Sequence, residues 1–142
     1  MSAKQLFKYQ ALDEAAHEIR ILSLQPGAFD DPISCTISHE PLRSADDYEA
    51  LSYCQGDPIL CREISINEAS FAVTKSAAYA LRYLRTTDRV RRIWIDAVCT
   101  NQANPRERMH QVKQMKNIYQ QALRVLACLA RNLMGAMTAL VF

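Results

Sequence analysis

The chain has 142 residues, of which 49% are hydrophobic and 23% charged, and its 17 basic residues nearly balance its 15 acidic residues. These values are typical of one globular domain and exclude a disordered, collagenous or disulfide-stapled chain. A net charge of +2 gives no support for a protein that binds along a nucleic-acid backbone.

The five cysteines predict reduced, mostly buried thiols and no metal site. The chain contains no CxxC pair, and the closest cysteines, Cys54 and Cys61, are too widely spaced for a zinc ligand pair.

Charges throughout the first 20 residues argue against a signal peptide. The apolar stretch 125–142 contains Arg131 and Asn132, so a membrane anchor is disfavoured. We therefore expect a cytoplasmic protein.

The chain up to residue 47 predicts an arm followed by two strands. Residues 1–17 mix polar and apolar types without a stripe and are expected to form an N-terminal arm. Alternation of apolar and polar residues predicts strands at 18–24 and 32–42, the first ending at Pro26-Gly27. A polar loop follows at 43–47, so 18–47 form a pair of lead-in strands.

The central part predicts a strand, a hairpin and a helix. Residues 48–53 form the strand, and a turn containing Gly56 and Asp57 ends it. Alternation over 64–73 predicts a hairpin that turns near Asn67 and Glu68. Thr74 is expected to cap a helix that continues to about residue 85.

The last part predicts two buried strands around a second helix. The apolar run 91–99, which includes Trp94, is expected to be a central strand covered on both faces, and 124–130 a second such strand. Asn104, Pro105 and Glu107 are typical of a helix start, so a helix is predicted over 105–122. We expect its inner stripe to consist of Met109, Val112, Met115, Tyr119 and Ala122.

Helices alternating with strands after residue 73 favour parallel strands joined by right-handed crossovers. In such sheets ligands bind at the carboxyl ends of the strands. Two polar loops are expected there, one after each of the strands 48–53 and 91–99. Their candidate residues are Tyr53, Gly56 and Asp57 in the first loop and Asp96, Asn101 and Gln102 in the second.

Three ordered motifs resemble the fungal heterokaryon incompatibility (HET) domain. They are YEALSY at 48–53 with Gly56-Asp57-Pro58, IWIDAVCTNQ at 93–102, and Glu107-Arg108 followed by Gln111-Val112, Met115 and Ile118-Tyr119. The resemblance covers 48–130, the expected domain core, and leaves 131–142 as an apolar tail. Two positions depart from the family pattern, because Gln55 replaces a tryptophan and Thr100 an isoleucine.

This resemblance implies a role in nonself recognition and cell death. It also implies a TIR-like, flavodoxin-like three-layer α/β domain with a mostly parallel sheet, and some TIR enzymes cleave NAD⁺. By this analogy NAD⁺ is the expected substrate and no cofactor is required. Glu107 and Asp96 are the catalytic candidates, while the ligand-binding candidates are Tyr53, Gly56, Asp57, Asn101, Gln102 and Arg108.

Each candidate also has a structural interpretation. Glu107 lies three residues after Asn104, where it fits an ordinary capping box, and Asp96 could organise a loop. Arg108 could be a solvated helix charge. The catalytic glutamate of TIR enzymes lies on the helix after the third strand, and this sequence has no acidic residue after Glu107. We therefore hypothesise a short or truncated HET protein that is incomplete at its C-terminus.

A different class of function competes with an enzyme. A non-catalytic interaction module, or a degenerate HET remnant, would self-associate through a sheet edge or the apolar tail. The expected partners are accordingly a second copy of the chain or another incompatibility protein.

Overall fold

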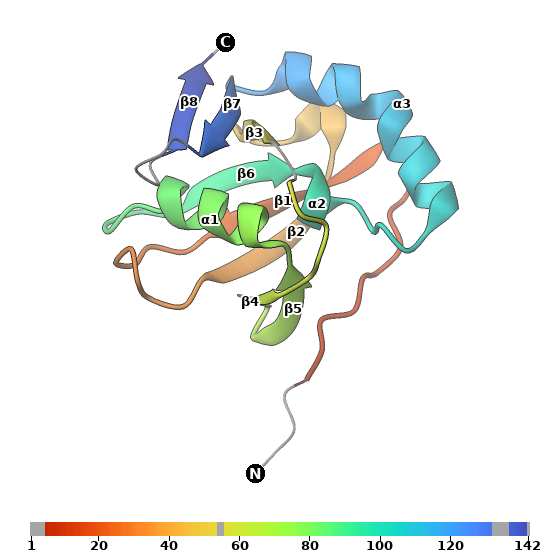
Figure 1. Cartoon of the computed structure of the whole chain (residues 1–142). Coiled ribbons are helices and arrows are strands. Elements are labelled where there is room, and N and C mark those ends of the chain that lie inside the picture. Colours follow the sequence, from red (N-terminus) through yellow and green to blue (C-terminus); the bar gives the residue numbers. More distant parts are fainter. Residues whose placement is uncertain (1–4, 54–55, 132–136, 142) are drawn as a thin grey trace.

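The computed structural model describes residues 5–53, 56–131 and 137–141. Within these ranges eight strands form a single sheet in the order β5-β4-β2-β1-β6-β3-β7-β8 (Figure 1). The strands are β1 (Glu18–Leu24), β2 (Ser34–Pro41), β3 (Glu49–Tyr53), β4 (Arg62–Ile66), β5 (Ala69–Val73), β6 (Arg91–Ile95), β7 (Arg124–Arg131) and β8 (Met137–Val141). The helices are the 3-10 helix η1 (Leu42–Ser44), α1 (Lys75–Leu84), the single turn α2 (Asp96–Cys99) and α3 (Pro105–Gln121).

The sheet is mixed, so the prediction of a mostly parallel sheet was wrong. β3 lies parallel to β6 and β7, and β2 lies parallel to β4, whereas β1 is antiparallel to both β2 and β6. β5 and β8 add antiparallel edges. The β4–β5 hairpin is antiparallel because its connection is short, and its turn residues Asn67 and Glu68 both have positive φ. The antiparallel pair of β1 and β6 joins strands far apart in the sequence, which local patterns do not predict.

The three parallel strands β6, β3 and β7 have helices on opposite faces. Along the sheet they follow the order second, first, third in the chain, which is also the order in flavodoxin-like sheets. Successive side chains of β6 point to opposite faces. Arg91 reaches the Leu84 carbonyl of α1, at 2.9 Å, while the Trp94 ring packs edge-on against Tyr119 of α3, with centroids 5.7 Å apart. A TIR-like relationship stays a prediction.

Both long helices begin where the sequence predicted. The Thr74 hydroxyl accepts the amide of Ala77 at 3.1 Å, and the Asn104 side chain accepts the amide of Glu107 at 3.2 Å. Only the first part of the predicted strand 91–99 is a strand, because β6 ends at Ile95 and the next four residues form the helical turn α2. A short continuous apolar run has no periodicity that separates these two structures.

The predicted inner stripe of α3 was correct in part. Met115, Tyr119 and Ala122 pack against the core, but Met109 and Val112 are 64% and 60% exposed. The buried side chains of α3 are instead mostly polar, namely Glu107, Gln111, Gln114 and Ile118. Two of them bond to other parts of the fold, because Glu107 binds Arg20 and Gln111 donates to the Glu18 carbonyl.

The core lies between the sheet and the helices, and Trp94 is fully buried in it. Cys35 and Cys99 are buried thiols, as predicted, and burial raises the pKa of each to about 12. Cys61 is exposed, and Cys54 lies outside the described residues. Part of the predicted apolar tail forms β8, which pairs with β7.

The N-terminal arm is attached to the domain. Leu6 bridges to Ser70, and the Tyr9 hydroxyl donates to the Val98 carbonyl at 2.6 Å. In the described part of the chain, no helix combines the length and the apolar character needed to cross a membrane.

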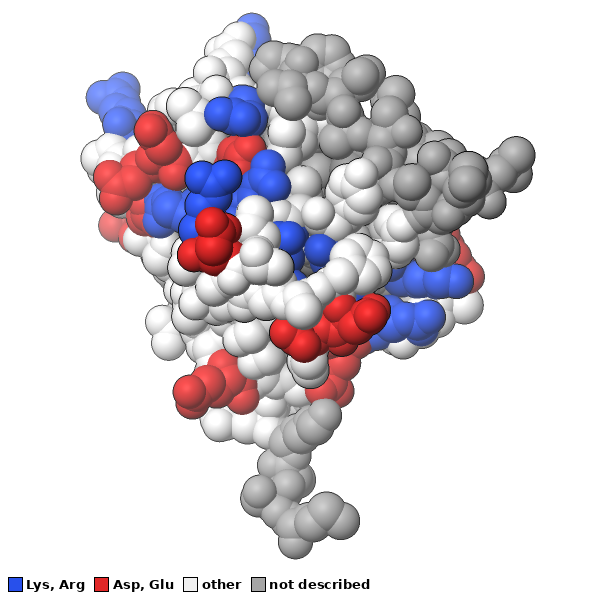
Figure 2. Space-filling view, turned by 90° about the vertical axis from the view of Figure 1, so that its left-hand side faces the viewer, with Lys and Arg blue, Asp and Glu red and all other residues white. Residues whose placement is uncertain are grey.

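Two arginines at the start of β6, Arg91 and Arg92, are paired with acidic side chains. Arg91 pairs with Glu49 and Arg92 with Glu40, at 2.6 and 2.7 Å. Figure 2 shows that basic and acidic side chains lie next to one another on the viewed face. This face therefore presents no extended field of one sign.

Candidate functional site

A cavity of about 430 Å³ opens at the carboxyl ends of β3 and β6. In open α/β sheets this edge is where ligands bind, because loops and helix starts converge there. The cavity is bordered by the end of β3, the loop after it, the end of β5 with the start of α1, α2, the loop before α3, and α3 itself. Its lining residues are Leu51, Ser52, Pro58, Leu60, Ala72, Val73, Thr74, Asp96, Ala97, Gln102, Met115 and Tyr119.

Polar side chains give the cavity its chemistry. Asp96 is the residue directly after β6, and its carboxylate interacts electrostatically with the Tyr119 hydroxyl of α3. Burial raises the pKa of Tyr119, the negative charge of Asp96 raises it further, and a hydrogen bond with Ser52 opposes the rise. With the Thr74 hydroxyl, which also caps α1, the cavity holds one carboxylate and three hydroxyl groups. Such a set binds sugar hydroxyls and stabilises a developing positive charge.

Gln102 and Gly56 shape the two loops at the cavity. The Gln102 amide donates to the Asp96 carbonyl at 3.0 Å, which fixes the loop before α3 against α2. Gly56 has a φ of +62°, and a Cβ there would lie 3.1 Å from the Ser76 hydroxyl oxygen at the start of α1. The positive φ therefore favours glycine at this position, and a side chain there would require Ser76 to shift.

Glu107 lies outside the cavity lining and forms a buried ion pair. Both its carboxylate oxygens accept from the Arg20 guanidinium, at 2.9 and 2.7 Å, and one also accepts from the Asn101 amide. Burial alone would raise the pKa of Glu107, but the hydrogen bonds from Arg20 and Asn101 outweigh burial and hold the pKa below its usual value. Its catalytic role stays a prediction, while its contacts give it a structural one.

Arg20 joins four parts of the chain. Besides Glu107 it donates to the Cys99 carbonyl at 3.1 Å and to the Gln10 carbonyl at 2.8 Å. Its guanidinium carbon lies 4.6 Å from the centre of the Tyr9 ring. The pair therefore connects β1, the N-terminal arm, α2 and the start of α3.

Asn101, Asp57 and Arg108 are not among the residues that line the cavity. Asn101 uses its side chain to accept the Ala103 amide, and Asp57 accepts the Ile59 amide, so both organise turns. Arg108 is exposed, and no described residue forms an ion pair with it. Tyr53 is the last residue of β3, and its side chain falls outside what the structure describes.

Sequence reasoning missed Ser52, Tyr119 and Arg20. Ser52 and Tyr119 lie within the motifs that resemble the family, but alternation and helical periodicity assign both to packing. Arg20 sits in the middle of an apolar strand, and this position is a usable signal, because a buried arginine requires a carboxylate partner.

Nothing among the described residues gathers three or more histidine, cysteine or acidic side chains around a metal-sized position. The cavity instead offers hydroxyl, carboxylate and amide groups beside the apolar Leu51 and Met115. This lining suits a small polar organic molecule with a flat or apolar portion.

Comparison with known proteins identifies relatives for most of the chain. Residues 48–139 match the family described as heterokaryon incompatibility protein (HET). Across 91% of its length the chain is 34% identical to heterokaryon incompatibility protein 6, OR allele, of Neurospora crassa. It spans 21% of that relative's length. No solved structure matches the chain.

The matched residues include the ends of β3 and β6, α2 and all the residues named above as the cavity lining. The match extends over well over half of the 142 residues. The chain therefore belongs to the heterokaryon incompatibility (HET) family.

Proposed function

We propose that the chain acts in fungal nonself recognition, as the domain of a heterokaryon incompatibility protein that leads to cell death, and that it does so by hydrolysing NAD⁺. Family membership supports the first part. The second part rests on one observation, the cavity at the carboxyl ends of two parallel strands, which combines Asp96 with the hydroxyls of Ser52 and Tyr119.

The reaction breaks the bond between C1′ of the ribose and N1 of nicotinamide. The bonding electrons leave with nicotinamide, water adds to C1′, and one proton is released, which gives nicotinamide and ADP-ribose without a further reactant. Asp96 stabilises the positive charge that develops on the ribose, and the hydroxyls of Ser52 and Tyr119 hold the ribose. The apolar side chains beside them exclude water from the base.

In this proposal Glu107 is a positioning residue. It accepts the Asn101 amide and so holds the loop that carries Gln102 against the cavity. Arg20 fixes Glu107 in turn, which extends the support from β1 to the site. Removal of Glu107 therefore acts on folding before it acts on chemistry.

The experiment is induced expression in yeast, with cellular NAD⁺ and growth measured for the chain, Asp96→Asn and Tyr119→Phe. We expect NAD⁺ loss and growth arrest with the natural chain, and a reduction of NAD⁺ cleavage of about 10²- to 10⁴-fold for Asp96→Asn. The control is Asp30→Asn, which removes an exposed carboxylate of the β1–β2 loop, outside the cavity lining, and should leave cleavage unchanged.

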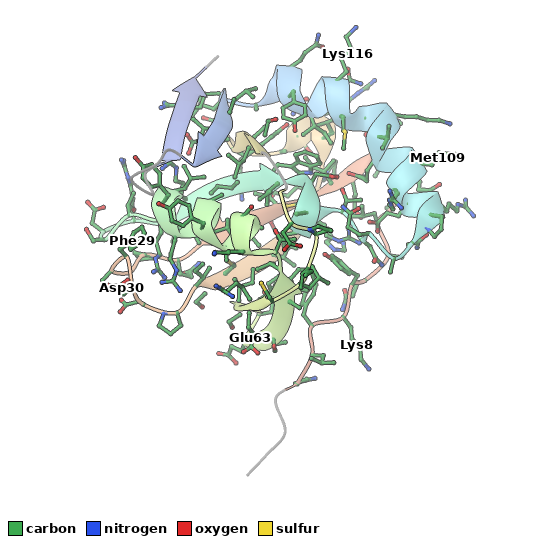
Figure 3. The ribbon with its side chains drawn as sticks, viewed as in Figure 1. Lys8, Phe29, Asp30, Glu63, Met109 and Lys116 are labelled. Atoms are coloured by element: carbon green, nitrogen blue, oxygen red, sulfur yellow. The ribbon has the colours of Figure 1, made fainter. Side chains whose placement is uncertain are left out.

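Unchanged NAD⁺ from a folded, abundant protein contradicts the enzymatic part. An interaction function would then account for the family membership better. Met109 and Val112 favour it, because they are exposed apolar side chains one turn apart on α3 and point away from the sheet, as Figure 3 shows for Met109.

A further inference from the structure

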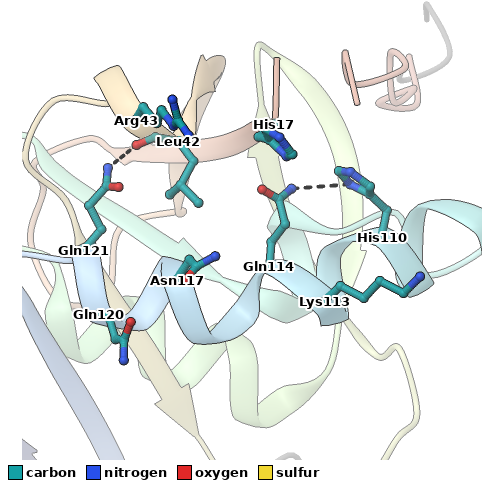
Figure 4. Close-up of a pocket in the computed structure, with 9 residues that line it drawn as sticks. All are labelled: His17, Leu42, Arg43, His110, Lys113, Gln114, Asn117, Gln120 and Gln121. Atoms are coloured by element: carbon teal, nitrogen blue, oxygen red, sulfur yellow. Dashed lines mark hydrogen bonds between the residues drawn. The ribbon is translucent and has the colours of Figure 1, made fainter. Parts of the chain in front are cut away.

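A second hollow, the amide groove, lies between α3 and the segments at residues 17 and 42–43. Its volume is about 630 Å³, and none of its lining residues belongs to the cavity described above. In Figure 4, side chains from α3 face His17, Leu42 and Arg43 across the groove. The lining residues are His17, Leu42, Arg43, His110, Lys113, Gln114, Asn117, Gln120 and Gln121.

The lining of the amide groove is rich in hydrogen-bond donors and contains no acidic residue. It has two permanent cations, Arg43 and Lys113, and four side-chain amides. Among the described residues neither cation forms a hydrogen bond or an ion pair through its side chain. In contrast, Arg20, Arg91 and Arg92 each bind a carboxylate.

Carboxylates on the neighbouring elements are bound elsewhere. Glu14 pairs with Arg106 at 3.3 Å, and Glu40 with Arg92 at 2.7 Å. Glu18 accepts the Asp13 amide at 2.7 Å and lies 3.8 Å from the His39 ring. The positive charges of the groove are therefore not neutralised by these three side chains.

Two histidines add donors at one end of the amide groove. The rings of His17 and His110 are nearly parallel, with an interplanar angle of 12° and centroids 6.3 Å apart. The Gln114 amide nitrogen lies 3.3 Å from Nδ1 of His110. His17 has a φ of 53° at the end of a turn, which its amide closes by donating to the Glu14 carbonyl.

We propose that the amide groove binds a small soluble molecule that carries phosphate groups. Phosphate oxygens accept hydrogen bonds from guanidinium, ammonium, imidazole and amide N–H groups. The side chains of Arg43 and Lys113 supply the positive charge that balances the phosphate. The groove volume is in the range of small-ligand sites. This binding is separate from NAD⁺ hydrolysis, because the two hollows share no lining residue.

The test is a titration of the full chain with pyrophosphate at constant pH, followed by NMR of the histidine ring protons. The chain has three histidines. We expect the signals of His17 and His110 to move in a saturable way. His39, which is absent from the groove lining, serves as the internal reference and should move little. Arg43→Ala and Lys113→Ala should each weaken binding about tenfold, since each removes a charged donor.

Lys116→Ala is the matched control for Lys113→Ala. Both lysines lie on α3, but Lys116 points away from the sheet in Figure 3 and does not line the groove. Equal losses from the two variants would mean attraction to net charge and would overturn the proposal. So would an absence of saturable shifts from the natural chain, whose fold the same spectra report. Binding confined to vesicles that contain phosphatidylinositol 4-phosphate, with no effect of pyrophosphate, would overturn the assignment to a soluble ligand.

Discussion

Arg20 and Glu107 are charged side chains that lie inside the molecule, 1% and 10% exposed, and their pairing joins β1 to the start of α3. Glu107→Gln would leave the Arg20 charge buried without its counterion. We expect the free energy of unfolding to fall by about 3–5 kcal/mol, measured by urea denaturation. The control is Glu14→Gln, whose exposed pair with Arg106 contributes at most about 1 kcal/mol. Similar losses from both variants would contradict a special role for the buried pair.

The same pair predicts how stability depends on pH. The pKa of Glu107 is lower in the folded chain than its usual value. Its stabilisation is therefore complete above the pKa of the unfolded chain and is lost as pH falls through the folded pKa. Urea midpoints measured from pH 7 down to pH 3 should fall more steeply for the natural chain than for Glu107→Gln. Parallel curves would show that other groups govern acid unfolding.

Thr100 and Thr74 are both buried, but only Thr74 uses its hydroxyl. Thr100 replaces the isoleucine of the family pattern, and its hydroxyl has no hydrogen-bond partner among the described residues. Thr100→Val should raise the free energy of unfolding by about 1 kcal/mol, because it removes an unsatisfied polar atom. Thr74→Val should lower it by about the same amount, since the cap of α1 is lost. Thermal unfolding of both variants checks the opposite signs, and a loss from Thr100→Val would show that its hydroxyl is satisfied.

At the scale of elements, α3 provides the clearest test of which face is buried. Ile118 is fully buried, so Ile118→Ala should cost about 2–5 kcal/mol of unfolding free energy. Val112, which the sequence placed on the inner stripe, is 60% exposed, and Val112→Ala should change stability by at most about 0.5 kcal/mol. Urea denaturation measures both. A large loss of unfolding free energy from Val112→Ala would show that Val112 is buried, as the predicted inner stripe requires.

Local sequence signals were sufficient to predict the positions of most helices and strands. The caps at Thr74 and Asn104 placed both helices, and alternation placed β1 and the β4–β5 hairpin. The inner face of α3 could not be predicted from periodicity, because polar side chains are buried there through bonds to distant parts of the chain, such as Gln111 to the Glu18 carbonyl and Glu107 to Arg20. The predicted strand directions were wrong for a similar reason, because the pairing of a strand depends on partners far away in the sequence.

At the scale of the whole molecule, the folding unit is larger than the matched family segment. The match begins at residue 48, but β1 lies between β2 and β6 and supplies the fully buried Ile19, Ile21, Leu22 and Leu24. A chain of residues 48–142 should therefore fail to fold, because it lacks β1 and β2, which leaves β6 with one neighbour and separates it from β4 and β5. Circular dichroism and NMR dispersion check this expectation, and addition of a peptide of residues 5–47 should restore structure. A well-dispersed spectrum from 48–142 alone would contradict it.

The candidate site could be predicted only in outline. The rule that ligands bind at carboxyl ends of strands led to Asp96 and Gln102, both of which line the cavity. It could not find Tyr119, which reaches the cavity from the last turn of α3. It also could not show that Glu107 has a buried partner 87 residues away.

The most direct test of NAD⁺ hydrolysis is nicotinamide release from NAD⁺ by the purified full chain, compared with folded Asp96→Asn. Our account predicts steady release by the natural chain and a loss of about 10²-fold or more in the variant, because the carboxylate acts on the developing charge. Equal release by both proteins would remove Asp96 from the chemistry. No release from the folded natural chain would contradict hydrolysis by this domain.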